Sequence, residues 1–91
     1  MELSTMYKAE KGLIKISAEV VGNTIERIRI TGDFFMIPEE ALLQLEISLS
    51  GTMIESRSVV EVLDRFYATG VITPSMTKED LVKAIMGLKK E

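Results

Sequence analysis

The chain has 91 residues, 46% of them hydrophobic and 27% charged, and this size and composition predict a single domain over residues 1–91. It contains no cysteine and no histidine, which excludes disulfides, thiolate or imidazole metal sites, cysteine nucleophiles and Ser-His-Asp triads. The net charge of −3, with lysines and arginines scattered singly, argues against a nucleic-acid partner.

Alternating apolar and polar residues predict three β-strands at the start of the chain. The segment Leu3–Ala9 is a weaker candidate, whereas the run Leu13–Val20 alternates strictly. A second strict run follows Gly22-Asn23, with Ile28 and Ile30 on one face. Together these segments predict an antiparallel meander that leaves one polar face in water.

The two strong strands also predict how they pair, because opposed residues of an antiparallel pair project to the same side. A two-residue loop at Gly22-Asn23 would set Ile16 opposite Arg29 and mix the two faces. A three-residue loop that also includes Val21 pairs Ile16 with Ile28 instead. We therefore predict the three-residue loop.

A first helix is predicted from Pro38, which suits a first helical position, to about Ser50. Glu39 and Glu40 follow the proline and favour the positive end of the helix dipole, and Gly51 suits the stop. The helical spacing predicts a buried stripe, made of Leu42, Leu45 and Leu49 and widened by Leu43 and Ile47.

Two further helices are predicted from capping-box patterns. Ser58 with Glu61 opens the second helix, which Gly70 ends, and Thr77 with Asp80 opens the third. Strands gathered first and helices second predict an α+β fold, in which a small antiparallel sheet of about three strands is covered on one face by three helices.

The segment Gly32-Asp33-Phe34-Phe35 stands at the end of the last predicted strand. Two adjacent aromatic residues cannot both point into one sheet face, so we expect one phenylalanine in the core and the other exposed. An exposed phenylalanine beside a rigid strand end is typical of a protein interface, where aromatic residues contribute a large share of the binding energy.

Asp33 has two interpretations. Its carboxylate could act as a general base, or it could stabilise a turn through the neighbouring backbone. We favour the turn, because the sequence fixes no second titrating group near it. No acidic residues follow the spacing of a ligand loop, so we predict no metal site and no catalytic residue in this chain.

The chain resembles the C-terminal accessory domain of lipoate-protein ligases, in the form in which that domain is a separate small subunit. Four segments bear the resemblance, and their order and spacing matter more than any one of them. They are Lys11-Gly12-Leu13-Ile14, Gly22-Asn23-Thr24-Ile25, the run from Ile28 to Phe35, and Leu49-Ser50-Gly51. In that family the domain has a small α+β fold similar to iron-sulfur scaffold proteins, whose cluster-binding cysteines this chain lacks.

The resemblance implies a non-catalytic subunit that acts in trans, in a heterodimer with a large catalytic subunit. That enzyme activates lipoate with ATP to lipoyl-adenylate and transfers the lipoyl group to a lysine of an acceptor domain. Lipoate, ATP and Mg²⁺ are expected on the large subunit, with no cofactor bound by this chain and only an indirect role toward the acceptor. We expect the partner interface at one end of the sheet, formed by Lys11, Gly12, Gly32, Asp33, Phe34 and Phe35.

The N-terminus lacks a signal peptide and no apolar run approaches the ~20 residues that span a bilayer, so we expect a cytoplasmic protein with no membrane partner. Two other functions stay open from the sequence. One is a free-standing interaction or scaffold module without a ligase partner. The other is an autonomous carboxylate enzyme centred on Asp33, which requires a polar pocket around that side chain.

Overall fold

Three antiparallel strands followed by three helices make up the fold in the computed structural model, which describes residues 1–89. The α+β arrangement predicted from the order of the elements is confirmed. The strands pair in the order β1-β2-β3. The elements are β1 (Glu2–Ala9), β2 (Gly12–Val21), β3 (Thr24–Gly32), α1 (Ala41–Leu49), α2 (Ser56–Tyr67) and α3 (Lys78–Met86).

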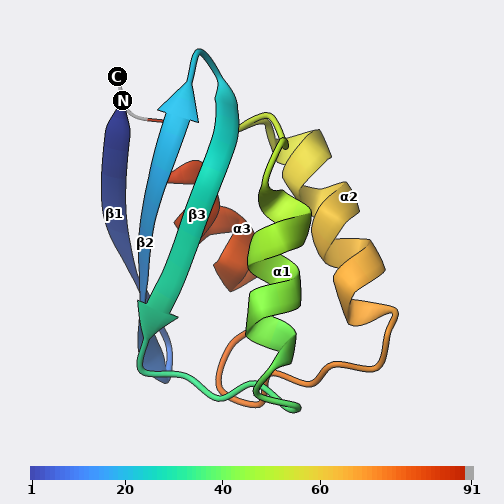
Figure 1. Cartoon of the computed structure of the whole chain (residues 1–91). Helices are drawn as coiled ribbons and strands as arrows, with labels where there is room; N and C mark the ends of the chain where they lie inside the picture. The colour runs from blue at the N-terminus through green and yellow to red at the C-terminus, as the bar shows by residue number, and fades with distance from the viewer. Residues whose placement is uncertain (90–91) are drawn as a thin grey trace.

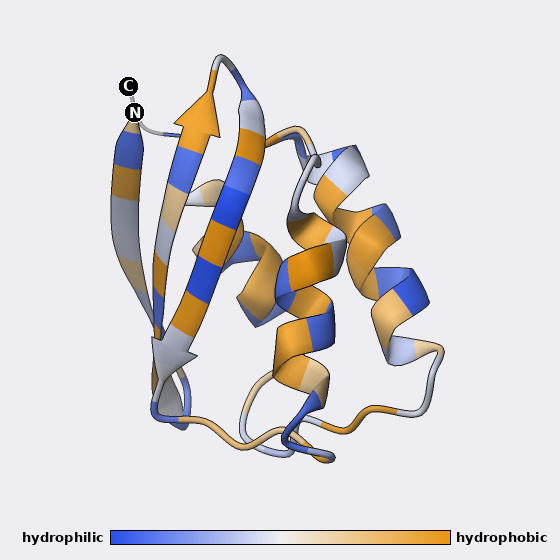
Figure 2. Ribbon diagram, in the orientation of Figure 1, coloured by the Kyte–Doolittle hydropathy of each residue, from blue (hydrophilic) through white to orange (hydrophobic). Residues whose placement is uncertain are grey.

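The helices form one layer over one face of the sheet (Figure 1). Helix α1 packs beside β3, α3 packs against β1 and β2, and α2 contacts both other helices. The apolar positions of the strands and helices meet between the two layers (Figure 2), and the predicted inward residues of β2 are buried there. The largest fully buried side chains include Ile14, Ile16, Ile25, Ile30, Leu45, Leu49, Leu63 and Leu81.

The loop between β2 and β3 has two residues, Gly22-Asn23, and the predicted three-residue loop is wrong. Gly22 has a φ of 63°, which suits the first central position of a tight hairpin turn. Beyond the turn the register shifts, so that Glu26 has no partner on β2 and Ile16 pairs with Ile30. The extra residue therefore lies in a β-bulge and not in the loop, and the bulge brings the apolar faces back into agreement.

Helix α1 begins three residues later than predicted. Residues 38–40 form a turn in which Ala41 N–H donates to the Pro38 carbonyl oxygen at 3.1 Å. The reason is tertiary, because Ile37 pairs through its backbone with Ile72, far along the chain. The chain must leave this extended bridge through a turn before it can enter the helix.

Helix α1 covers the free edge of β3 with polar groups. Ile30 N–H donates to Glu46 Oε2 at 2.8 Å, and Ser50 Oγ donates to the Glu26 carbonyl oxygen at 2.5 Å. Unpaired edge groups would otherwise favour pairing with another chain, so these contacts protect the edge.

Leu43 and Ile47 do not widen the buried stripe of α1 as predicted. They are 59% and 58% exposed, and they border a hollow of about 470 Å³ between α1 and β3. The core side of α1 is formed by Ala41, Leu45 and Leu49, because the helix lies at the margin of the sheet and packs only against β3 and α2.

The predicted cap of α2 is also wrong. The helix begins at Ser56, the residue before it, Glu55, makes no side-chain cap hydrogen bond, and Ser58 already lies within the first turn. Buried Ile54 donates its N–H to the Asn23 carbonyl oxygen at 2.8 Å. This contact with the β2–β3 loop fixes the chain just before the helix, and it moves the helix start ahead of the capping pattern.

The capping box of α3 is confirmed. Asp80 N–H donates to Thr77 Oγ1 at 3.1 Å, and Thr77 N–H donates to Asp80 Oδ2 at 2.9 Å. We expect Thr77→Ala to lower the free energy of unfolding by about 1 kcal/mol, since it leaves an N-terminal N–H of the helix without its partner. Urea titration checks this, with Ser58→Ala as the control, because Ser58 caps no helix and should lose less than about 0.5 kcal/mol. Equal losses in the two variants would contradict the assignment.

Candidate functional site

The six residues expected at the partner interface come together at one end of the sheet, which we call the motif end. Lys11 lies in the β1–β2 turn, Gly12 begins β2, and Gly32 closes β3 beside them. Asp33 N–H donates to the Leu13 carbonyl oxygen at 2.8 Å and continues the pairing one residue past β3. The β2–β3 hairpin lies at the opposite end (Figure 1). The motif end comprises Lys11, Gly12, Gly32, Asp33, Phe34 and Phe35.

Two glycines allow the backbones to meet closely at the motif end. A Cβ atom added at Gly12 would lie well under 3.0 Å from the Asp33 carbonyl oxygen, and one added at Gly32 would lie equally close to the Leu13 carbonyl oxygen. Gly32 also has a φ of 141°, which side-chain-bearing residues rarely adopt. Both glycines are therefore required by the backbone geometry.

Phe34 and Phe35 divide as the sequence predicts. Phe34 is partly buried and packs against the core, whereas Phe35 is 70% exposed. Phe35 is held in place through its backbone, because its N–H donates to Ser75 Oγ at 3.2 Å. An exposed aromatic side chain on a backbone fixed at both sides has little ordering entropy left to lose on binding.

Ile37 and Ile72 extend this apolar surface, and no sequence pattern pointed to either of them. They are 53% and 56% exposed, and their backbones exchange hydrogen bonds of 2.9 and 3.0 Å. Nothing in the sequence signals the pair, because the two residues lie 35 positions apart in the chain. Together with Phe35 they make an exposed apolar surface supplied by two distant segments.

Hydrogen bonds stabilise the loop that supports Phe35 and Ile37. Thr73 Oγ1 donates to the Met76 carbonyl oxygen at 2.9 Å, and the Tyr67 hydroxyl lies 2.8 Å from Thr73 Oγ1. Burial raises the pKa of Tyr67 above its ordinary value of 10.0, and the carboxylates of Asp80 and Glu79 raise it further against the opposing hydrogen bond from Thr73. The phenol is therefore neutral at physiological pH and keeps its proton for this network.

Asp33 is exposed, and it does not line any of three hollows that lie on the surface of residues 1–89. None of these three hollows therefore supplies the polar pocket that an enzyme centred on this carboxylate requires. Across the same described range, acidic side chains do not gather in threes as they would to bind a metal ion. No helix within that range is both long enough and apolar enough to cross a bilayer.

Comparison with known proteins identifies relatives over nearly the whole chain. Residues 1–85 match the family model described as bacterial lipoate protein ligase C-terminus. Lipoate-protein ligase A subunit 2 of Thermoplasma acidophilum is 42% identical over 85 residues, which are 93% of this chain and 88% of that protein. A chain in a solved structure of an archaeal lipoylation system, a bi-partite lipoate protein ligase and its E2 lipoyl domain from the same organism, aligns with a TM-score of 0.86. It is 41% identical over 93% of this chain and 94% of the matched chain.

Proposed function

Because the chain belongs to the bacterial lipoate protein ligase C-terminus family, we propose that it is the non-catalytic small subunit of a bipartite lipoate-protein ligase. It assembles with a large catalytic subunit, and both are required for ATP-dependent activation of lipoate to lipoyl-adenylate and for lipoylation of acceptor lysines. The main support is the relative named as subunit 2, which is 42% identical along most of both chains.

The chemistry of the chain supports this division of labour. Adenylation needs organised phosphate contacts and commonly Mg²⁺, which prefers carboxylate and phosphate oxygens. The glycines at the motif end serve close backbone approach, and acidic side chains do not converge as metal ligands within residues 1–89. The residues present do not fit these groups, so we assign lipoate, ATP and Mg²⁺ to the large subunit.

We assign docking of the large subunit to the motif end together with Ile37 and Ile72. Phe35 contributes the most exposed aromatic side chain there, and Phe34 fixes its position by packing against the core. Exposed apolar side chains on rigid backbone are the features that concentrate binding energy in protein interfaces. Lys11 adds a charged rim beside this apolar centre.

Docking acts on catalysis indirectly in this proposal. Contact with the small subunit orders or closes substrate loops of the large subunit, so that lipoyl-adenylate forms only in the assembled complex. The small subunit then contributes binding free energy to a conformational step, and none of its side chains touches the reacting atoms.

Reconstitution with each subunit omitted in turn tests the proposed function. Lipoyl-adenylate formation from lipoate and ATP, and lipoylation of an acceptor domain, are measured for the large subunit, for the small subunit and for the mixture. We expect adenylate from the mixture only. Full activity of the large subunit alone would reject the mechanism, and failure of the two proteins to associate would favour the free-standing interaction module.

A further inference from the structure

The face of the sheet that points away from the helices is open and polar. Along each strand the residues that face the helices are partly or fully buried, and the alternate residues form this outer face. An antiparallel sheet can leave one face in water, so exposure by itself carries no information about function. We define the outer sheet face by the three rows of residues nearest the motif end, which are Lys8, Leu13, Met6, Lys15, Thr31, Ser4, Ser17 and Arg29.

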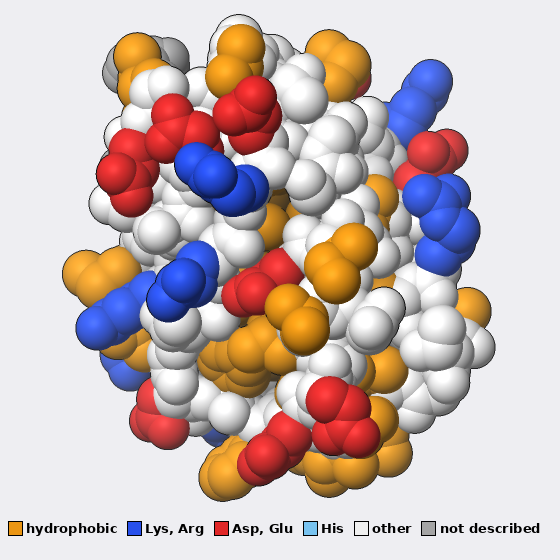
Figure 3. Space-filling model, in the orientation of Figure 1, with side chains coloured by type: hydrophobic (Ala, Val, Ile, Leu, Met, Phe, Trp, Pro, Cys, Tyr) orange, Lys and Arg blue, Asp and Glu red, His pale blue; other side chains and the backbone are white. Residues whose placement is uncertain are grey.

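Most of the charge on this face is positive. Lys8, Lys15 and Arg29 are all exposed, although the chain as a whole has a net charge of −3, and the carboxylate of Asp33 borders the row of Lys8 and Leu13 at the motif end. Within residues 1–89 none of these three cations is in an ion pair. In Figure 3, Lys and Arg side chains lie over the strands at the left of the view, with Asp and Glu side chains above and below them.

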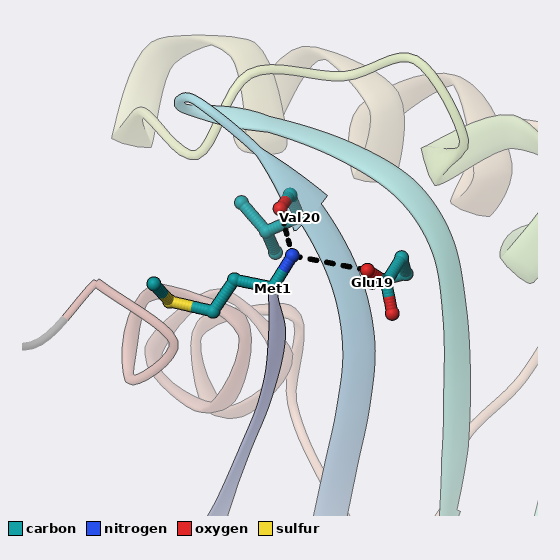
Figure 4. Close-up of polar contacts among 3 residues, drawn as sticks. All are labelled: Met1, Glu19 and Val20. Atoms are coloured by element: carbon teal, nitrogen blue, oxygen red, sulfur yellow. Dashed lines mark hydrogen bonds and ion pairs between the residues drawn. The ribbon is translucent and has the colours of Figure 1, made fainter.

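Two further carboxylates, those of Glu2 and Glu19, lie in the next row, toward the end of the sheet far from the motif end. Glu19 pairs across the sheet with Glu2 and with Arg27. Its Oε2 atom accepts from the terminal amine of Met1 at 3.0 Å, and that amine also donates to the Val20 carbonyl oxygen at 3.0 Å (Figure 4). Glu19 therefore has positive partners of its own, and Arg29 shares a second hollow with Glu2, Glu19 and Glu46.

The outer sheet face is also hollowed. A depression of about 660 Å³ lies over it, and its lining includes Lys15, Arg29 and hydroxyl groups but no carboxylate. Met6, 65% exposed, adds an apolar side chain to this lining. Guanidinium, ammonium and hydroxyl groups donate hydrogen bonds to carboxylates, and the guanidinium can do so with two parallel bonds.

We propose that the outer sheet face binds an acidic surface of the large subunit and extends the docking interface beyond the motif end. This inference rests on the proposed function. The two surfaces are continuous, because Lys8 pairs with Leu13, whose carbonyl oxygen accepts from Asp33 N–H at the motif end. The apolar motif end supplies most of the affinity, and the cationic face speeds association and fixes the orientation of the partner.

Charge reversal at two positions tests the proposal. In the variant Lys15→Glu/Arg29→Glu each substitution lowers the net charge by two units, so that the total changes from −3 to −7. The matched control, Arg57→Glu/Lys83→Glu, makes the same change at exposed positions of α2 and α3. Association with the purified large subunit is measured by surface plasmon resonance at several salt concentrations, after circular dichroism has shown that both variants are folded.

We expect the sheet variant to associate on the order of tenfold more slowly at low salt, and its rate to depend less steeply on salt than that of the wild type. The control should stay within about twofold of the wild type. Equal slowing of both variants would overturn the proposal, because it would reflect the charge of the whole molecule. Unchanged association of the sheet variant, while Phe35→Ala still weakens binding, would overturn this proposal and leave the proposed function intact. Absence of binding by the wild-type chain would instead reject the proposed function, and this inference with it.

Discussion

Phe35→Ala is expected to weaken binding of the large subunit by about 2 kcal/mol, or about thirtyfold in the dissociation constant. The side chain is 70% exposed in the isolated chain and contributes little to its core. Its truncation therefore removes apolar contact area from the complex and leaves the free domain almost unchanged. Isothermal titration calorimetry of the two purified subunits measures the loss, and urea titration of the variant checks that its stability is retained.

Two control variants make this result specific. Val21 is 57% exposed and lies next to the β2–β3 hairpin, at the end of the sheet opposite the motif end, so Val21→Ala should leave the affinity unchanged. Phe34 packs against the core, so Phe34→Ala should lower the free energy of unfolding by about 2 kcal/mol. If Phe35→Ala bound as tightly as the wild type while remaining folded, Phe35 would have no place in the interface.

Among substitutions at the motif end, Gly32→Ala is expected to be the most destabilising addition of a Cβ atom. It should lower the free energy of unfolding by about 3 kcal/mol or more. The new Cβ would overlap the Leu13 carbonyl oxygen, and a φ of 141° is strained for alanine. Relief requires separating β2 from β3 where Asp33 N–H bonds to that same oxygen. The midpoint of urea unfolding, with an unchanged slope, reports the loss.

Gly22→Ala provides the matched comparison. Gly22 also has a positive φ, of 63°, but a Cβ there would meet nothing within 4 Å. Gly22→Ala should therefore lower the free energy of unfolding by only about 1 kcal/mol, because the positive φ disfavours alanine but the new Cβ overlaps no other atom. If the two alanine variants were equally stable, close backbone approach would not be the reason for glycine at position 32.

Local patterns in the sequence predicted much of this fold. The three strands follow from period-two alternation, the α3 cap follows from Thr77 with Asp80, and Gly51 marks the end of α1. The separation of Phe34 from Phe35 was likewise predictable, because two neighbours on extended backbone cannot share one face. Each of these features depends on residues that are close together in the chain.

The predictions that failed depend on contacts between distant residues. The Ile37–Ile72 bridge delays the start of α1, and contact of Ile54 with the hairpin loop advances the start of α2. The bulge at Glu26 keeps the apolar residues of β2 and β3 on the same face of the sheet, and the length of the loop alone does not predict it. Exposure of Leu43 and Ile47 follows from the place of α1 at the margin of the sheet, which helical periodicity cannot indicate.

The sequence by itself determined the strands-then-helices order, the motif Gly32-Asp33-Phe34-Phe35 and the family resemblance, because these reside in local spacing. Only the tertiary structure decided that Phe35 is the exposed aromatic residue, that Ile72 pairs with Ile37 from a distant loop, and that Lys15 and Arg29 share the open face of the sheet. The physical reason is that exposure and charge environment depend on what packs against a residue. For a residue at the edge of a small domain, that neighbour comes from elsewhere in the chain.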